Sequence, residues 1–151
     1  MVQPIPDGYH TVTPYLIVNA GAEALEFYRQ AFGAVERERM ADASGKIHHA
    51  EFSIGESRVM LADENRELGA LGPETIGGSP VSIHLYVGDV DAVVARAVAA
   101  GARLARPVAD QFYGDRVGGI IDPFGHRWFI ATRKENLTID EIRRRAAARA
   151  R

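Results

Sequence analysis

The chain has 151 residues, 46% of them hydrophobic, which is enough for one domain with its own hydrophobic core. It contains no cysteine, so disulfides, thiolate metal sites and a cysteine nucleophile are excluded. Its net charge of -2 gives no general attraction to nucleic acid or membranes, and it shows neither a signal-peptide pattern nor an apolar run near the roughly 20 residues that span a bilayer. We therefore expect a cytoplasmic protein whose partner is a small molecule.

The first half of the chain predicts one strand, one helix and three further strands. Residues 11–18 alternate in polarity like a half-buried strand, with Val12, Leu16 and Val18 on one side. Residues 22–32 change to helical spacing before a glycine that ends the helix. Three runs with strand character follow, at residues 35–40, 47–54 and 58–62.

The second half repeats this order. Residues 66–80 contain four glycines and two prolines and are expected to form a connecting loop. A strand at residues 81–87 and a helix capped by Asp89 come next. Three further strands are expected at residues 103–108, 116–121 and 127–132. The whole chain, 1–151, is therefore expected to form one domain with two similar modules, at about residues 9–65 and 81–133.

Each predicted helix covers one face of its sheet, so the opposite face is free to line a ligand-binding cup or to face solvent. Strand alternation places mostly apolar side chains under the helices: Ala50, Phe52, Ile54, Val59, Leu61, Trp128 and Ile130. It places polar and aromatic side chains on the free faces: Thr13, Tyr15, His49, Glu51, Ser53, Arg58, Met60, Ser82, His84, Tyr86, Arg127 and Phe129. Periodicity alone favours neither the cup nor a solvent-facing sheet.

A terminal helix is predicted at about residues 138–150. Thr138 and Glu141 form a capping box, in which each side chain hydrogen-bonds the other residue's backbone N–H. The helix is rich in arginine and alanine, and Ile139 and Ile142 are its only large apolar anchors. Since no aromatic residues separate the arginines, the helix does not indicate nucleic-acid or membrane binding, and we expect a solvated tail or one that clasps a second subunit.

Two short motifs carry a resemblance to a known superfamily: FYxxxFG at residues 27–33 and DPxGH at residues 122–126. In this order and spacing, within two strand–helix–three-strand halves, they resemble the vicinal oxygen chelate superfamily, which includes glyoxalase I, bleomycin-resistance proteins and extradiol dioxygenases. Residues 8–16, 49–51, 111–116 and 122–128 are similar to its PhnB-like branch. The resemblance implies an α+β fold of two βαβββ modules that form a mixed-sheet cup, with a short C-terminal helix, and it implies a homodimer.

Metal-dependent members of this superfamily hold a divalent ion with His or Glu side chains at four strand positions. Aligned through the helices, these positions fall on Thr13, about Met60, Ser82 and Phe129. None of these side chains is a usual ligand for such an ion, and two are apolar. The resemblance therefore implies the cup of this superfamily without its usual metal cofactor.

Three titratable residues on the free faces are the candidate catalytic residues: His49, Glu51 and His84. An imidazole that reaches a substrate acts as a general acid or base. Imidazole and carboxylate are also ligands for zinc, nickel or iron, so a displaced divalent metal site made from these three residues is an alternative. A further alternative gives His49 and Glu51 only a solvent-facing polar pair, and His84 only a hydrogen bond within the cup.

A glycine-containing loop before a strand carries the remaining candidates. Tyr113, Asp115 and Arg116 are positioned to orient an anionic or enolic ligand. Alternatively, Asp115 and Arg116 form a buried structural ion pair while Tyr113 packs against the core. His126 is expected to satisfy backbone groups of its turn, and His10 is expected to be structural.

The leading hypothesis is a glyoxalase/bleomycin-resistance-like protein that binds a small organic molecule through these residues: Thr13, Tyr15, Met60, Tyr86, Tyr113, Arg116 and Phe129. One alternative is a metal-dependent lyase, isomerase or dioxygenase of the same fold. Another is a protein that sequesters a planar antibiotic by stacking it on aromatic rings. Because this fold supports all three functions, the sequence does not decide whether the protein is an enzyme.

Overall fold

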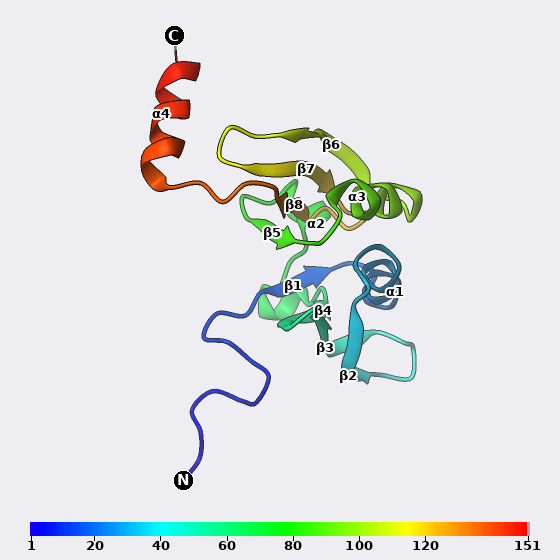
Figure 1. Cartoon of the computed structure of the whole chain (residues 1–151). Coiled ribbons are helices and arrows are strands. Elements are labelled where there is room, and N and C mark those ends of the chain that lie inside the picture. Colours follow the sequence, from blue (N-terminus) through cyan, green and yellow to red (C-terminus); the bar gives the residue numbers. More distant parts are fainter. Residues whose placement is uncertain (151) are drawn as a thin grey trace. The chain divides into compact units, whose positions relative to one another are not determined.

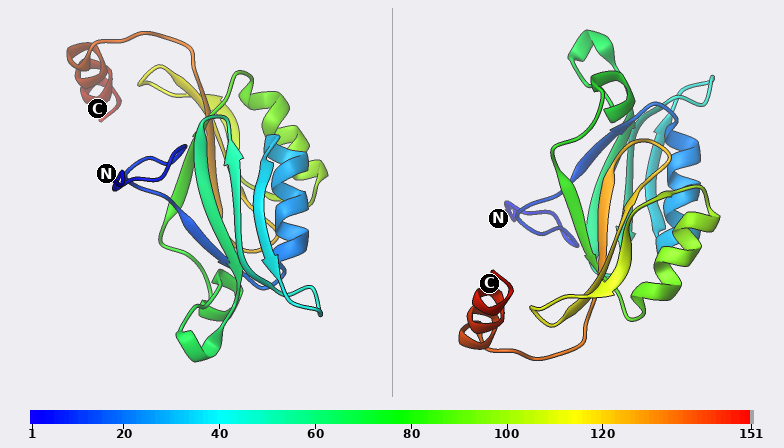
Figure 2. Two further views of the ribbon diagram at one scale, coloured as in Figure 1. Left: turned by 90° about the horizontal axis from the view of Figure 1, so that it is seen from below. Right: turned by 90° about the horizontal axis from the view of Figure 1, so that it is seen from above.

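The computed structural model describes residues 1–150 and divides the chain into two compact units (Figure 1). The first unit comprises Met1–Pro80 and Pro123–His126, and the second comprises Val81–Asp122 and the chain from Arg127 onward. Each unit has a mixed sheet with a helix against one face (Figure 2). This is the α+β fold of two βαβββ modules that the sequence predicts.

The first unit contains β1 (Tyr15–Val18), α1 (Gly21–Phe32), β2 (Val35–Ala41), β3 (Ile47–Ile54) and β4 (Ser57–Asp63). Within the described residues its strands pair in the order β1-β4-β3-β2, with β1 parallel to β4 and the other pairs antiparallel. Helix α1 ends at Gly33, whose positive φ of 68° lets its N–H donate to the carbonyl of Arg29. The predicted helix and the three strands after it match to within one residue at each end.

The core of the first unit lies between α1 and the sheet. The ring of Tyr28 is fully buried and stacks on Phe52 of β3 at a centroid distance of 5.3 Å. Phe124, from the turn that belongs to this unit, packs against Phe27 of α1 at 6.2 Å. Burial of such an aromatic side chain contributes about 1.5–3 kcal/mol, so these contacts fix the sheet whose opposite face carries the site.

The second unit contains β5 (Ser82–Tyr86), α3 (Val90–Ala99), β6 (Arg103–Asp110), β7 (Asp115–Ile121), β8 (Arg127–Arg133) and α4 (Ile139–Arg149). Over the described chain its strands pair in the order β5-β8-β7-β6, with β5 parallel to β8. Helix α3 begins after the predicted cap Asp89, whose carboxylate accepts a hydrogen bond from the N–H of Ala92 at 3.2 Å. In the core, Trp128 donates its Nε1–H to the buried carboxylate of Asp122 at 2.9 Å.

The two sheets repeat the same register. Tyr15 pairs with Met60 between β1 and β4, and His84 pairs with Phe129 between β5 and β8. Each member of the second pair lies 69 residues after its counterpart in the first. The repeat predicted from the order of elements is therefore present in the residue pairing.

The first strand is shorter than predicted. It begins at Tyr15, and Val12, which the alternation placed in the core, is 83% exposed. The pairing with β4 ends where the carbonyl of Pro14 accepts a hydrogen bond from the N–H of Met60 at 2.9 Å. Because proline has no N–H with which to continue the ladder, the residues before it leave the sheet.

Two short helical turns interrupt the predicted loop at residues 66–80. They are the 3-10 turn η1 (Arg66–Leu68) and the one-turn helix α2 (Pro73–Ile76). Pro73 occupies the first helical position, where a missing N–H costs nothing, and Gly77 ends the turn at a φ of 100°. The expectation of a segment without elements was wrong, because proline and glycine here begin and end a helical turn.

Helix α4 begins as predicted but is attached differently. Thr138 Oγ1 accepts a hydrogen bond from the N–H of Glu141 at 3.1 Å, as expected of the cap. The expected anchor Ile139 is 61% exposed, so that part of the prediction was wrong. The guanidinium of Arg145 instead donates to the carbonyl of Phe112 at 3.2 Å. Neither α4 nor any other helix in residues 1–150 is both long enough and apolar enough to cross a membrane.

Candidate functional site

The face of the first sheet opposite α1 carries the polar side chains that strand alternation predicts. Ala50 and Phe52 of β3 are buried, whereas His49 and Glu51, which alternate with them, are partly exposed on the other side. Tyr15, at the start of β1, lies on the same side as His49 and Glu51. We call this surface, defined by Tyr15, His49 and Glu51, the polar face.

The three residues of the polar face form one hydrogen-bonded chain. The Tyr15 hydroxyl lies 2.8 Å from His49 Nδ1, and His49 Nε2 lies 3.0 Å from Glu51 Oε2. An ionised carboxylate only accepts hydrogen bonds, so we assign the ring proton to His49 Nε2. Nδ1 is then the acceptor, and the Tyr15 hydroxyl donates to it. The arrangement joins a phenol, an imidazole base and an orienting carboxylate, which is the order that activates a hydroxyl.

Tyr9, from the segment before β1, closes the carboxylate end of this chain. Its hydroxyl donates to Glu51 Oε1, and the guanidinium of Arg58 lies 5.4 Å from the centre of its ring. The neighbouring Gly8 has a φ of 82°, and a Cβ there would lie 2.9 Å from Arg58 Nη2. Sequence reasoning missed Tyr9 because this segment is irregular and has no periodicity. Its only signal was its position within residues 8–16, which carry part of the resemblance.

The corresponding face of the second sheet is aromatic. The rings of His84 and Tyr86 lie 5.0 Å apart, and that of His84 lies 6.4 Å from Phe129 on the paired strand. The guanidinium of Arg106 lies 5.5 Å from the centre of the Phe129 ring. We call this surface, defined by His84, Tyr86 and Phe129, the aromatic face. Rings beside a cation offer stacking surface to a planar molecule.

Tyr86 has a buried partner although it is 60% exposed. Its hydroxyl donates to the carboxylate of Asp115 at 2.7 Å. This hydrogen bond, and then partial burial, raises the pKa of Tyr86 above its ordinary value. The ring of Tyr113, another predicted ligand residue, packs edge-on against Phe112 at 5.2 Å. The aromatic face therefore presents a phenol that is held neutral.

Arg116 does not join the aromatic face. Its guanidinium pairs with Asp91 of α3 at 2.8 Å and with Asp110 of β6 at 3.1 Å. Hydrogen bonding to Arg116 lowers the pKa of the Asp91 carboxyl. The alternative of a buried pair between Asp115 and Arg116 was wrong, because neighbours along a strand point to opposite faces. Arg116 ties β7 to α3, and its contact with a ligand stays a prediction.

The residues at the positions where the resemblance implies metal ligands do not fit a divalent ion. Thr13 and Ser82 offer only hydroxyl groups, and Met60 offers only a thioether. The fourth position, Phe129, has a phenyl ring that faces the guanidinium of Arg106. This donor set lacks the imidazoles and carboxylates that such an ion requires.

The displaced alternative joins residues of different units. His49 and Glu51 lie together in the first unit, whereas His84 belongs to the second. Within residues 1–150, no group of three or more histidine, aspartate or glutamate side chains is placed to hold a metal ion. The chemistry available on the polar face is therefore that of its own side chains.

Three further histidines lie outside the polar and aromatic faces, and one of them, His10, is exposed in the segment before β1. The Nε2–H of His126 donates to the carbonyl of Ile17 at 2.8 Å, so His126 does satisfy a backbone group, but one on β1 and not one of its own turn. His48, which precedes His49 on β3, lies 3.0 Å from Asp42. Hydrogen bonds from the Ser44 hydroxyl and from His48 lower the pKa of Asp42 to about 2. The side chain of His48 thus contacts the β2–β3 turn and not the polar face.

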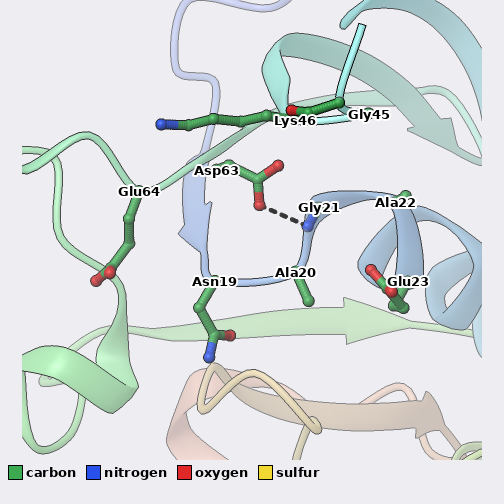
Figure 3. A pocket seen from close by; sticks show the side chains of 10 residues that line it. Asn19, Ala20, Gly21, Ala22, Glu23, Gly45, Lys46, Asp63 and Glu64 are labelled. Atoms are coloured by element: carbon green, nitrogen blue, oxygen red, sulfur yellow. Dashed lines mark hydrogen bonds between the residues drawn. The ribbon is translucent and has the colours of Figure 1, made fainter. Parts of the chain in front are cut away.

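A cavity of about 510 Å³ lies elsewhere in the first unit, at the start of α1 (Figure 3). The Asp63 carboxylate accepts hydrogen bonds from the N–H groups of Gly21 and Ile47, each at 2.7 Å. Lys46 and Glu64 also line this cavity, which the sequence did not predict. The start of a helix is ordinarily a favourable place for an anion. Here the Asp63 carboxylate already accepts the N–H of Gly21 at the start of α1, and its negative charge disfavours a second anion. The polar face remains the candidate site.

Comparison with known proteins agrees with this architecture. A sequence model of the Glyoxalase/Bleomycin resistance protein/Dioxygenase superfamily matches residues 9–130. The uncharacterized protein Mb0911c of Mycobacterium bovis is 41% identical over 134 residues, which are 87% of this chain and 88% of that protein. The solved structure of the Arabidopsis thaliana gene product At5g48480 is 28% identical, with a TM-score of 0.66 over 82% of this chain and 98% of that chain. The PhnB protein of Bacillus cereus, 18% identical, shares the fold with a TM-score of 0.64 over 82% of this chain and 99% of that one.

Proposed function

Because this chain belongs to the Glyoxalase/Bleomycin resistance protein/Dioxygenase superfamily, we propose that it binds a small organic molecule on the polar face. The hydrogen-bonded chain from Tyr15 through His49 to Glu51 is the observation that carries the proposal. Titratable groups that hold one another in a fixed geometry on a partly exposed surface offer a ligand both donors and acceptors. Tyr15, which is 48% exposed, is the most accessible of the three.

A thermal-shift screen tests this proposal. The probes are a panel of 2-oxo acids, catechols and other phenols, because a ligand that binds only the folded protein raises its melting temperature. We expect at least one probe to raise Tm, and we expect Tyr15→Phe and His49→Ala to reduce that shift. His48→Ala is the matched control, since His48 precedes His49 on β3 but contacts Asp42. A shift that survives both polar-face substitutions contradicts the proposal.

The proposed binding requires no divalent metal. This part of the proposal is supported by the unsuitable donors at Met60 and Phe129. Metal analysis of the purified protein tests it, and we expect no stoichiometric divalent ion. A stoichiometric ion that is lost in Glu51→Ala or His84→Ala would instead favour a metal-dependent lyase, isomerase or dioxygenase.

A second candidate function, sequestration of a planar antibiotic, is favoured by the aromatic face. His84, Phe129 and the guanidinium of Arg106 provide adjacent surfaces for stacking. Doxorubicin is a suitable fluorescent probe because stacking on aromatic rings quenches its emission. Quenching that is lost in Phe129→Ala and kept in His48→Ala supports sequestration. Equal emission with and without the protein contradicts it.

We also propose that two copies of the chain associate, as the resemblance implies. Every residue of β2 is exposed, and β2 is an outer strand of the first sheet. An outer strand of this kind leaves backbone groups available for pairing. Light scattering during size-exclusion chromatography is expected to give twice the mass of one chain, and a monomer at all concentrations contradicts the proposal.

A further inference from the structure

We propose that Tyr15 is the residue that exchanges a proton with the bound molecule, that His49 takes up the proton of Tyr15, and that Glu51 and Tyr9 position His49. This inference rests on the ligand-binding role proposed for the polar face. It assigns a direction to the hydrogen-bonded chain, and it predicts a ligand with an acidic hydroxyl group, a phenol or an enol.

The order of the groups gives the direction of proton transfer. The Tyr15 hydroxyl donates to His49 Nδ1 at 2.8 Å, so a ligand proton that moves to the Tyr15 oxygen displaces the phenolic proton to Nδ1. The ligand O–H bond breaks and a new Tyr15 O–H bond forms, while the original Tyr15 O–H bond breaks and an Nδ1–H bond forms. The products are a ligand anion and an imidazolium beside the Glu51 carboxylate, so no proton or charge is lost.

Exposure identifies Tyr15 as the end that meets the ligand. Tyr15 is 48% exposed, whereas the side chains of His49 and Glu51 are 23% and 22% exposed. The other end of the chain is closed, because the Tyr9 hydroxyl donates to Glu51 Oε1 while His49 uses Oε2. Both carboxylate oxygens of Glu51 are therefore engaged, which fixes the imidazole and its tautomer.

The surrounding charges are mixed. Arg58 on β4 lies over the ring of Tyr9, and Glu38 on β2 pairs in register with Glu51. His49 pairs in register with Met40, which carries no charge. The imidazolium formed by proton transfer therefore has the Glu51 carboxylate as its direct partner.

Tyr86 is a natural comparison within the same chain. It is 60% exposed, slightly more than Tyr15, but its hydroxyl donates to the Asp115 carboxylate and not to an imidazole. That hydrogen bond raises the pKa of Tyr86 and so opposes loss of its proton. If exposure alone governed reactivity, Tyr86 would react at least as fast as Tyr15.

Acetylation by N-acetylimidazole tests the proposal without any ligand. The phenolic oxygen attacks the acetyl carbon, its proton passes to a base and imidazole leaves, so the rate reports on the base beside each tyrosine. Mass spectrometry of peptides from the intact protein is expected to show Tyr15 acetylated at least about tenfold faster than Tyr86, because a positioned general base accelerates such steps by roughly 10²–10⁴-fold. Equal rates, or a faster reaction of Tyr86, overturn the inference.

Two substitutions separate proton transfer from access. Glu51→Gln keeps the size of the side chain but removes the charge that stabilises the imidazolium, so Tyr15 acetylation is expected to slow severalfold. His49→Gln is expected to reduce the rate to about that of Tyr86. His48→Gln is the control and is expected to leave it unchanged. An unchanged rate in both Glu51→Gln and His49→Gln shows that the contacts are only structural and overturns the inference.

The ring nitrogens of His49 provide a second measurement that mere packing would not change. Nitrogen-15 NMR of the labelled protein is expected to show the proton on Nε2, and Tyr15→Phe is expected to move the Nδ1 signal. A proton on Nδ1 in the wild-type protein overturns the assigned direction. Both measurements are made without ligand, so a failed binding screen and a failed proton relay are distinguishable.

The ligand class is tested with 4-nitrophenol, whose anion is yellow and whose neutral form is not. At a pH where the free probe is mostly neutral, adding the protein is expected to increase the anion absorbance. Tyr15→Phe is expected to abolish this increase, and His48→Gln is expected to keep it. Absorbance that the wild-type protein leaves unchanged counts against phenols as the ligand class.

Discussion

At matching positions, the free faces of the two sheets carry different chemistry. In the first sheet, one row of paired residues crosses three strands and consists of Tyr15, Met60 and Glu51. The corresponding row in the second sheet consists of His84, Phe129 and Gly119. A Cβ at Gly119 would lie only 3.3 Å from Cε1 of Phe129, so the ring occupies the space above the glycine. Where the first sheet holds the carboxylate that orients an imidazole, the second holds an aromatic ring.

The helix-covered sides of the same strands did not diverge in this way. Phe52 pairs with Val59 in the first unit, and the matching pair in the second is Ile120 with Trp128. All four are apolar and buried. Packing under a helix constrains volume and polarity, whereas a free face is constrained only by what it binds. The repeat therefore preserved the fold and left two different surfaces for function.

Substitutions in the two cores are expected to have the strongest effects, and these effects should be similar in the two units. Phe52→Ala is expected to lower the free energy of unfolding by about 3–5 kcal/mol, and Ile120→Ala by about 2–5 kcal/mol, since each residue is 1% exposed. Urea denaturation followed by circular dichroism measures both. Tyr15→Phe on the polar face is the control and is expected to change stability by less than about 1 kcal/mol. If Phe52→Ala and Ile120→Ala each lower the free energy of unfolding by less than about 1 kcal/mol, the buried sides of the two sheets do not contribute equally to stability in the way proposed.

A substitution that makes the faces alike is expected to have the next largest effect. Gly119→Glu places a carboxylate where the first sheet has Glu51, but its Cβ would lie 3.1 Å from that of Arg106. We expect a loss of about 1–3 kcal/mol in urea denaturation, because Phe129 and Arg106 must move. Gly119→Ala adds only the Cβ and separates backbone crowding from charge. If both variants are as stable as the wild type, crowding by Phe129 and Arg106 is not the reason why a glycine occupies position 119.

The strand pattern predicted much of this arrangement. Alternation along β3 placed His49 and Glu51 on one side and Ala50 and Phe52 on the other, because the period of a strand is fixed at two residues. The hydrogen bond from the Tyr15 hydroxyl to His49 was not predictable, since it depends on the register between strands that are not adjacent in the sequence. The sequence placed the two residues on one face, and the fold determined that they touch.

The sequence was less informative where regular structure ends. Tyr9 lies in an irregular segment, so no periodicity identified it as a partner of Glu51. Arg116 was assigned to a ligand-binding loop, but β7 already begins at Asp115, and the side chain of Arg116 reaches Asp91 on α3. Which face a residue joins is uncertain near a strand end, because one residue of error moves the side chain to the other side.

On the aromatic face, Tyr86 is expected to keep its proton above the ordinary pKa of a phenol. Asp115→Asn is expected to lower the pKa of Tyr86 toward its ordinary value, because the carboxylate that accepts its proton is removed. Since the pKa of Tyr86 is raised on folding, its hydrogen bond stabilises fully below the ordinary range of a phenol and is lost as pH rises through the raised value. Carbon-13 NMR of the tyrosine rings measures this, and Tyr86→Phe is expected to cost about 1 kcal/mol at neutral pH. If the pKa of Tyr86 is the same in Asp115→Asn as in the wild type, the Asp115 carboxylate is not the cause of the raised pKa.

The weakest effect is expected in the turns that join β2 to β3 and β6 to β7, each of which links an outer strand to its inner neighbour. In the β2–β3 turn, Asp42 accepts hydrogen bonds from Ser44 and from the N–H of Lys46, and its pKa is lowered to about 2. Since this pKa is depressed on folding, the stabilisation is present above the ordinary range of an aspartate and is lost as pH falls toward about 2.

Amide hydrogen exchange measures how the β2–β3 and β6–β7 turns differ in their response to acid. The N–H groups of Ser44 and Lys46 are expected to keep their protection at pH 4 and to lose it near pH 2, whereas Asp42→Ala removes it at both. The β6–β7 turn provides the comparison, because the N–H of Gly114 donates to the backbone carbonyl of Gln111 and needs no carboxylate. Its protection is expected to be the same at both pH values, once the intrinsic exchange rate is taken into account. A parallel loss of protection in the two turns would show that the unit as a whole, and not Asp42, responds to acid.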